Sequence, residues 1–179
     1  DEPLPVFVYP LDYDQRHTGA VNLDYRFGET DVPKGFLGDV LKNLGVNLNF
    51  SFNSGRPYTK RDNSTTATGS GGSYIQSAKN EVYTGWNTRF DLKIDKGFKV
   101  WKTYFTVYAY VINLLNTELV NSVFPSTGKP DDNGFINTPT GASRYENDPV
   151  FRELWRDRIS YVSNWGPPRQ IRFGIQMNF

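Results

Sequence analysis

Four charged side chains at every second position are the strongest candidate for chemistry in this sequence. If the segment is a β-strand, this spacing places all of them on one face. Such a face is suited to contact a polar ligand or a packed polar domain. It is equally suited to be a hydrated wall whose mixed charges only retain water, and the sequence leaves both interpretations open. The four residues are Arg89, Asp91, Lys93 and Asp95.

Other reactive residues lack the neighbours that catalysis or metal binding requires. His17 is the only histidine and there is no cysteine, so a metal would find no usual ligand set; a hydrogen-bonding role at a strand entry is expected instead. The segment "KPDDNGF" (129–135) lacks the terminal Glu of a calcium loop, which favours a plain turn. No Gly-x-Ser-x-Gly motif occurs. We therefore predict no enzyme and no cofactor.

Composition excludes several classes of protein. The net charge of the 179 residues is +1 with both signs spread along the chain, which gives no nucleic-acid signature. No apolar run approaches the roughly 18 residues of a membrane-spanning helix. Aromatic residues make up 16% although the mean hydropathy is −0.57, so apolar and polar residues must be interleaved. The opening "DEPLPVF" has no leader character, which predicts a mature protein or a piece of a longer one.

Five segments alternate apolar and polar residues with the period of a β-strand. They cover residues 19–28, 46–55, 88–98, 101–113 and 169–179. In the last one, apolar side chains stand at Ile171, Phe173, Ile175, Met177 and Phe179. Each segment therefore has one apolar face and one polar face, as expected for a strand that separates two different environments.

The connections between these segments alternate in length. Residues 36–44 are expected to form a short amphipathic helix, and "KGFKV" (96–100) is expected to be a tight turn. Two long loops are expected at about 55–85 and 114–167. The first contains the low-complexity stretch 63–73, and the second contains a helix that Asp148 would cap and Pro149 would begin.

Strand length and loop length together favour a membrane barrel over a soluble sandwich. Strands of about eleven residues at a tilt near 40° span roughly 27 Å, close to the apolar height of outer-membrane barrels. Long loops on one side and short turns on the other are typical of that architecture. We predict an all-β, antiparallel, up-and-down transmembrane β-barrel with apolar faces in lipid, polar faces in the lumen and Trp101 in an interfacial girdle. A soluble sandwich remains the alternative.

Five strands cannot close such a barrel, because unpaired edges are not tolerated in lipid. The chain is therefore expected to be the C-terminal segment of a larger barrel. Five ordered blocks over nearly the whole chain resemble the end of TonB-dependent outer-membrane receptors of the Bacteroidetes-like type. The blocks are 9–28, 47–59, 87–100, 107–135 and 166–179, which include the motif residues Asp14, Arg16, His17, Gly55, Arg56, Pro57, Asn113, Leu114 and Asn116.

The resemblance implies a barrel of about 22 strands filled by a plug domain that is not in this sequence. It implies residence in the bacterial outer membrane and contact with lipid and lipopolysaccharide. It also implies TonB-energised uptake of an unidentified small ligand, with TonB contacted through the missing N-terminal region. The charged row would then face the plug or the ligand path. The alternative is a non-transporting barrel that acts as a surface scaffold or as part of an envelope assembly.

Two further groups of residues follow from this interpretation. The last strand resembles the signal that the barrel-assembly machinery recognises, with Phe173 and Phe179 as the candidate residues; a lipid-facing role alone is the alternative for Phe179. In the long loops, four aromatic residues are candidates to stack on a ligand or to pack on one another. They are Tyr58, Tyr74, Trp155 and Trp165.

Overall fold

The computed structural model describes residues 7–28, 30, 32–62 and 74–178. The chain forms two compact units. The sheet unit comprises Thr18–Phe52, Thr88–Thr117 and Pro167–Phe179, and the loop unit comprises Asp1–His17, Asn53–Asn87 and Glu118–Gly166. No helix in the described ranges is both long enough and apolar enough to cross a membrane.

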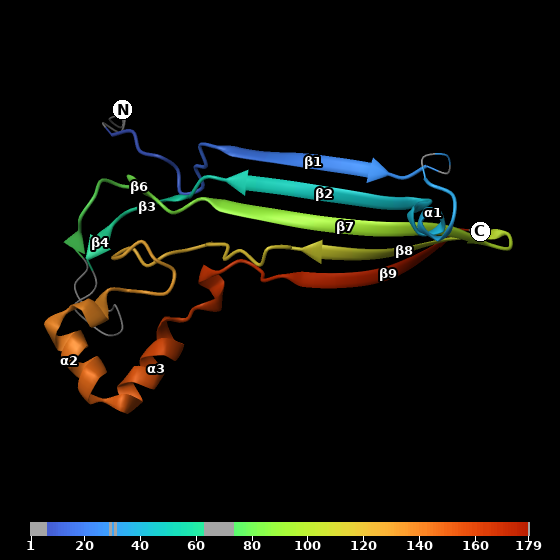
Figure 1. Ribbon diagram of the computed structural model, residues 1–179. Coiled ribbons are helices and arrows are strands. Elements are labelled where there is room, and N and C mark those ends of the chain that lie inside the picture. The colour runs from blue at the N-terminus through green and yellow to red at the C-terminus, as the bar shows by residue number, and fades with distance from the viewer. Residues whose placement is uncertain (1–6, 29, 31, 63–73, 179) are drawn as a thin grey trace. The chain divides into compact units, whose positions relative to one another are not determined.

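The five predicted long strands are confirmed. They form one open antiparallel sheet in the order β1-β2-β7-β8-β9 (Figure 1). Their bounds are β1 Thr18–Arg26, β2 Leu44–Asn53, β7 Asn87–Val100, β8 Thr103–Ile112 and β9 Gln170–Asn178. Long strands that follow one another in the sequence are neighbours in the sheet, so the up-and-down connectivity is also confirmed. The described strands do not close into a barrel, and β1 and β9 are the edges.

The register of the last three strands sorts side chains by polarity across the sheet. Leu92 lies opposite Val111, which lies opposite Ile171, and the next row on the same face is Ile94, Ala109 and Phe173. The opposite face carries rows such as Lys93, Tyr110 and Arg172. Because most of these pairs place like residues beside like, the two faces of the sheet differ in polarity across β7, β8 and β9.

The expected tight turn at "KGFKV" is wrong. β7 continues through this segment to Val100, and the turn is made by Trp101 and Lys102, since Val100 pairs with Thr103. Trp101 has a left-handed φ of 60° and is 97% exposed. Gly97 therefore lies within the strand, at the place where a side chain from β8 covers it.

Two glycines of the polar face lie beneath tyrosines of β8. A methyl group on Gly97 would be 2.0 Å from the Tyr104 hydroxyl, and one on Gly174 would be 2.4 Å from the Tyr108 ring. Tyr104 thus extends toward β7 and Tyr108 toward β9. Cross-strand covering by an aromatic ring compensates for the missing side chain of a strand glycine.

The short predicted helix is present as α1, Phe36–Leu41, but Leu44 already belongs to β2. The ammonium group of Lys96 donates to the main-chain oxygens of Asp39, Val40 and Lys42 at 2.5–2.8 Å. A cation at the C-terminal end of a helix satisfies carbonyls that have no partner within it. This contact explains why a lysine occupies an apolar position of β7.

The loop unit contains short elements that the sequence analysis largely missed. Its strands are β3 Pro57–Tyr58, β4 Arg61–Asp62, β5 Tyr74–Ile75 and β6 Val82–Tyr83, where β3 pairs with β6 and β4 with β5. Its helices are η1 Phe135–Asn137, α2 Pro139–Asn147, α3 Pro149–Ile159 and η2 Val162–Asn164. The predicted low-complexity stretch 63–73 lies outside the described residues.

The predicted capping of α3 is confirmed, because Asp148 accepts a hydrogen bond from the Phe151 main chain at 3.0 Å. α2 begins in the same way, with Thr138 as the cap and Pro139 as the first helical residue. Phe135 and Trp155, which are 3% and 2% exposed, form the small apolar core of this unit. The loop unit is thus locally ordered by caps, short strand pairs and aromatic packing.

Candidate functional site

The apolar face of the sheet is exposed along both edge strands. On the edge strand β9, Ile171 is 58% exposed, Phe173 is 78% exposed and Ile175 is 68% exposed. Leu23 on the other edge strand is 61% exposed. A contiguous exposed apolar surface of this kind marks contact with a membrane or another protein.

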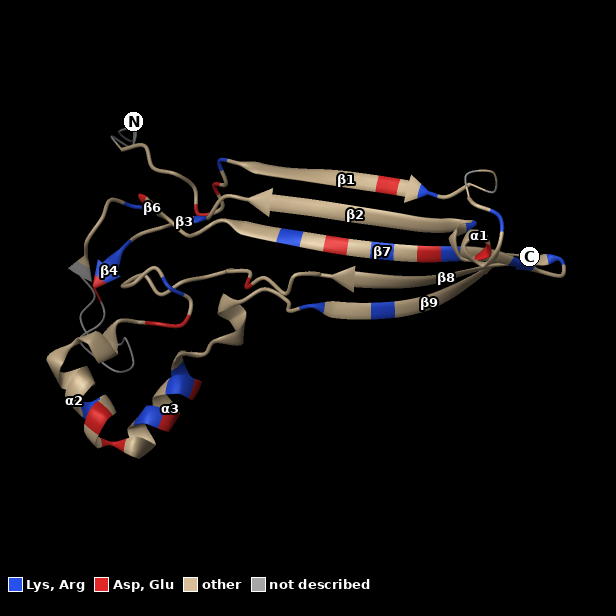
Figure 2. Cartoon of the chain, viewed as in Figure 1, with Lys and Arg blue, Asp and Glu red and all other residues tan. Residues whose placement is uncertain are grey.

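Charged residues are concentrated on β7, the central strand, whereas β2 and β8 carry none (Figure 2). The predicted row does share one face, but its members have different surroundings. Arg89 Nε lies 3.1 Å from Asp91 Oδ2, and Asp91 is 2% exposed. Lys93 is exposed, with its ammonium 5.5 Å from the centre of the Tyr108 ring.

Asp95 is engaged by a residue two strands away. Arg26 of β1 reaches across β2 and places its guanidinium 2.8 Å from the Asp95 carboxylate. The Arg26 side chain can cross β2 because Gly45 lies between the guanidinium and the carboxylate. A methyl group on Gly45 would be 2.6 Å from an atom of each of the two side chains. Arg26 and Asp95 therefore bind β1 to β7 over the polar face.

The motif formed by Asn113, Leu114 and Asn116 organises the end of the sheet at which β8 ends. Asn113 is 0% exposed and has a left-handed φ of 55°. Its main-chain N–H donates to Asp91 at 2.9 Å, and its side chain exchanges hydrogen bonds with the main chain of Thr117 at 2.9 and 3.0 Å. It also donates to the Pro167 oxygen at 3.3 Å. One asparagine thus connects the ends of β7, β8 and the segment before β9.

The other two motifs form strand-end contacts within the loop unit. They are Asp14, Arg16 and His17, and Gly55, Arg56 and Pro57. The main-chain N–H of His17 donates to the Ser54 hydroxyl at 3.2 Å, and the main-chain N–H of Ser54 donates to the main-chain oxygen of His17 at 2.7 Å. The His17 ring stacks on Trp86 at 5.7 Å between centroids. Gly55 is required because a methyl group there would be 1.8 Å from the Thr84 oxygen. The expected strand-entry role of His17 fits these contacts.

The aromatic residues predicted for the loops have separate surroundings. Trp155 is buried, with its ring 5.3 Å from the Phe135 ring, so it is part of a core rather than free to stack on a ligand. Tyr58 is half-buried, and its burial raises the pKa of the phenol above its usual value. Trp165 is also half-buried and pairs with Val120 in a β-bridge. Phe179 and the side chain of Tyr74 lie outside the described residues.

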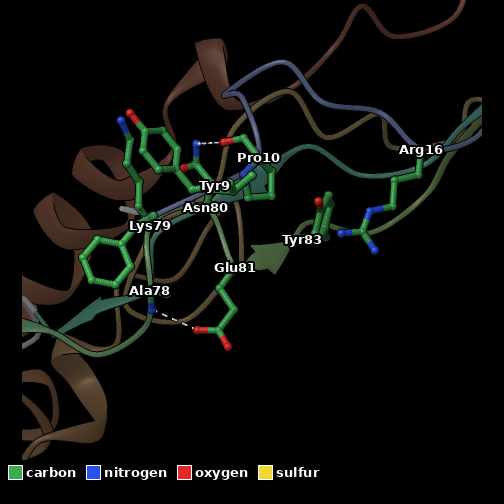
Figure 3. A pocket seen from close by; sticks show the side chains of 10 residues that line it. Tyr9, Pro10, Arg16, Ala78, Lys79, Asn80, Glu81 and Tyr83 are labelled. Atoms are coloured by element: carbon green, nitrogen blue, oxygen red, sulfur yellow. Dashed lines mark hydrogen bonds between the residues drawn. The ribbon is translucent and has the colours of Figure 1, made fainter. Parts of the chain in front are cut away.

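The sequence analysis missed a pocket of about 570 Å³ in the loop unit. Two segments form it, residues 7–10 and 78–83, together with Arg16 (Figure 3). Its volume is within the range of small-molecule sites. Two cations lie on its tyrosines: Lys79 Nζ is 4.1 Å from the centre of the Tyr9 ring, and Arg16 Cζ is 4.6 Å from the centre of the Tyr83 ring.

Buried Asn80 holds the two segments together. It is 4% exposed and has a left-handed φ of 58°. Its side-chain amide donates to the Pro10 oxygen at 2.8 Å and to Asp12 at 2.6 Å, and its main-chain N–H donates to the Thr59 hydroxyl at 3.0 Å. Because both walls are fixed by these bonds, the pocket is formed before any ligand arrives.

The described residues contain no group of three or more histidines, cysteines or carboxylates that could hold a metal ion. No protein-family model, curated protein or solved structure matches the chain.

Proposed function

We propose that this chain is the C-terminal segment of an outer-membrane β-barrel receptor of the TonB-dependent kind, which imports an unidentified small ligand. The observation that carries the proposal is the polarity of the sheet. Its apolar face is exposed on both edge strands, and its other face carries the charged row of β7, whereas Lys96 on the apolar face is engaged by main-chain oxygens at the end of α1. A sheet that separates lipid from a wet interior needs this arrangement in every strand.

The open edges of the sheet support a larger barrel. β1 and β9 each have one side without a described partner strand, and unpaired backbone groups are costly in hydrocarbon. Pairing of both edges with further strands of the same barrel removes that cost. The resemblance of five sequence blocks to TonB-dependent receptors implies a barrel of about 22 strands with a plug inside.

The polar face then faces the plug or the ligand path. Asp91 and Asp95 are already engaged within the sheet, by Asn113 and Arg26 respectively. Lys93, Arg172 and Asp24 of β1 are exposed on this face, so charges of both signs are available to contact a plug.

Site-directed spin labelling of the full protein in lipid bilayers tests the orientation of the sheet. Because the chain has no cysteine, single cysteines at Phe173 and Ile175 can carry a label on one face, and cysteines at Arg172 and Gln176 on the other. We expect the first pair to be relaxed by oxygen dissolved in lipid and the second pair by a water-soluble nickel chelate. The same accessibility at all four positions would contradict a membrane-spanning strand.

Transport is tested separately in cells. Cells that lack this receptor and cells with disrupted TonB are grown in a defined mixture of nutrients, and the compounds left in the medium are measured by mass spectrometry. We expect at least one compound to remain in both cultures and to be consumed by the parent strain. If receptor deletion leaves no compound behind, the barrel is a non-transporting scaffold.

A further inference from the structure

Helix α1 lies between β1 and β2 in the sequence and carries apolar side chains on its outside. Phe36 is 81% exposed, Leu37 is 66% exposed and Val40 is 46% exposed. The spacing of these residues places them along one side of the helix. Of the six helical residues, Gly38 is the buried one. A helix this short is marginal in water by itself, and its exposed apolar side indicates contact with another apolar environment.

The sheet holds this helix from its apolar face. Lys96 lies opposite Val107, which lies opposite Ile175, in one row of that face. The ammonium group of Lys96 donates to three main-chain oxygens at the end of α1, at 2.5–2.8 Å. The end of the helix is therefore reached from the side of the sheet that carries the exposed apolar side chains.

α1 and the β7–β8 turn lie at the same end of the sheet (Figure 1). Lys96 is close to Val100, where β7 ends, and a lysine near the surface of a bilayer costs much less than one at its centre. Its stem can lie along apolar surface while the ammonium reaches polar groups, which here are the carbonyls of α1. Trp101 follows β7 directly and is 97% exposed. Tryptophan is typical of the headgroup level of membrane barrels, so this end of the sheet has the features of a membrane surface.

We propose that α1 lies in the membrane–water interface on the lipid side of the sheet, with Phe36, Leu37 and Val40 inserted among the acyl chains next to the headgroups. A helix with one apolar side binds a bilayer in this way. The apolar face of the sheet continues to this point, since Phe98, the next residue after Lys96 on that face, is 40% exposed. The inference rests on the proposed function, because it requires lipid against the sheet, and it adds a membrane contact made by a segment that is not a strand.

Fluorescence quenching of the full protein in phosphatidylcholine vesicles tests the inference. Because the chain has no cysteine, the variants Leu37→Cys, Asp39→Cys and Phe173→Cys can each carry one NBD fluorophore. Asp39 is exposed and does not share a side of the helix with Leu37. We expect the Leu37 label to be quenched by lipids with a nitroxide near the headgroup, and the Asp39 label by iodide in the water. The Phe173 label reports on the apolar face of the sheet.

Lys96→Met tests the anchor and leaves an apolar side chain on the apolar face. We expect it to release α1 and to raise iodide quenching of the Leu37 label by about threefold. Lys93→Met is the matched control on the opposite face of β7 and should leave the quenching unchanged. A retained melting temperature shows that the barrel is intact. If Lys96→Met unfolds, the comparison of the Leu37 and Asp39 labels with Lys96 in place decides the matter.

The outcomes separate this inference from the proposed function. A Phe173 label that no lipid nitroxide quenches would contradict the proposed function itself. If lipid quenches the Phe173 label, equal iodide quenching at Leu37 and Asp39 would overturn the inference, because α1 would then lie in water. A Leu37 label that neither quencher reaches would also overturn it, since a protein partner would then cover the helix. Equal quenching in Lys96→Met and Lys93→Met would overturn the role of Lys96 as the anchor.

Discussion

Asn113 in the sheet unit and Asn80 in the loop unit are both buried and have left-handed backbones. Both connect segments that are distant in the sequence, but in different surroundings. Each has its amide bonded to main-chain oxygens of a distant segment. Asn113 secures the ends of long strands whose order is already specified by alternating residues. Asn80 secures segments that have no such pattern and whose association depends on a few polar contacts.

The difference shows how order is distributed in this molecule. In the sheet, many equivalent cross-strand pairs contribute to stability, so the remaining pairs keep the strands in place when one contact is lost. In the loop unit, individual side chains such as Asp148 and Asn80 determine local structure. Segments held by few contacts open at lower free energy than the rest of a protein. We therefore expect a substitution in the loop unit to lower only the local stability of its segment, and a substitution in the sheet to lower the stability of the whole sheet.

The largest effect is expected for Asn113→Ala. The change removes four side-chain hydrogen bonds at a fully buried position and leaves alanine with a left-handed φ. We expect the free energy of unfolding of the full protein to fall by about 4 kcal/mol, measured by denaturant unfolding in detergent. Asn116→Ala is the matched control, since Asn116 is left-handed but exposed and should cost about 1 kcal/mol. Equal losses would show that burial is unimportant.

A charge on the apolar face should have the next largest effect. Phe173→Arg places a guanidinium where lipid is proposed, at an expected cost of about 3 kcal/mol to folding in a bilayer. Gln176→Arg adds the same charge to the opposite face of β9 and should cost less than about 1 kcal/mol. Folding titrations in lipid vesicles measure both, and a smaller cost for Phe173→Arg than for Gln176→Arg would reverse the assignment of the faces.

Asn80→Ala should lower the stability of the loop unit without lowering that of the sheet. Three side-chain hydrogen bonds of a buried residue are lost, to Pro10, Asp12 and Thr59, so the local stability of residues 7–12 and 78–83 should fall by about 3 kcal/mol. We expect faster proteolytic cleavage within these segments and an unchanged global unfolding midpoint. A midpoint that falls as far as in Asn113→Ala would mean that the two units unfold as one.

Adding a single methyl group beneath Tyr108 should have a smaller effect. Gly174→Ala brings a carbon to 2.4 Å from the tyrosine ring, and such overpacking costs about 1–2 kcal/mol. The double variant with Tyr108→Thr removes the ring and should recover part of the loss, which a double-mutant cycle of unfolding free energies measures. Additive effects would mean that the ring moves aside at no cost.

The smallest effect concerns pH and the loop unit. Because burial raises the pKa of Tyr58, the folded state resists ionisation of its phenol more than the unfolded state does. The corresponding stability is present below the ordinary tyrosine pKa of about 10 and is lost as pH rises through the raised value. Tyr58→Phe should therefore make loop stability, followed by protease resistance between pH 9 and pH 11, less sensitive to alkali. The same sensitivity in both proteins would contradict this role.

The sequence was sufficient for the sheet because alternation over about ten residues is a repeated signal. It was insufficient where one contact decides the structure. The glycine in "KGFKV" suggested a turn, and only the register shows that Tyr104 covers Gly97 within a strand. For Trp155 the sequence left open a ligand contact or packing within the loops, and its place one helical turn after Phe151 on α3 makes it a core residue.

The same limit explains α2 and the loop pocket. Helix α2 was missed because its Pro, Gly and Ser residues favour turns, although Thr138 before Pro139 is a cap signal that could have identified it. The pocket could not be predicted, because its walls are joined by a hydrogen bond between residues 70 positions apart. No local pattern connects Asn80 with Pro10.

The choice of glycine at position 45 depends on two other residues, Arg26 and Asp95. Since Arg26 crosses it to reach Asp95, a larger residue there would separate a pair to which it contributes no atom. Selection should then act on the three positions as a unit. Among descendants of this gene, loss of the arginine or the aspartate would release the middle position to vary, whereas retention of both would keep it glycine. A strand-skipping ion pair of this kind would leave a three-way evolutionary correlation that pairwise contact maps assign to the wrong neighbours.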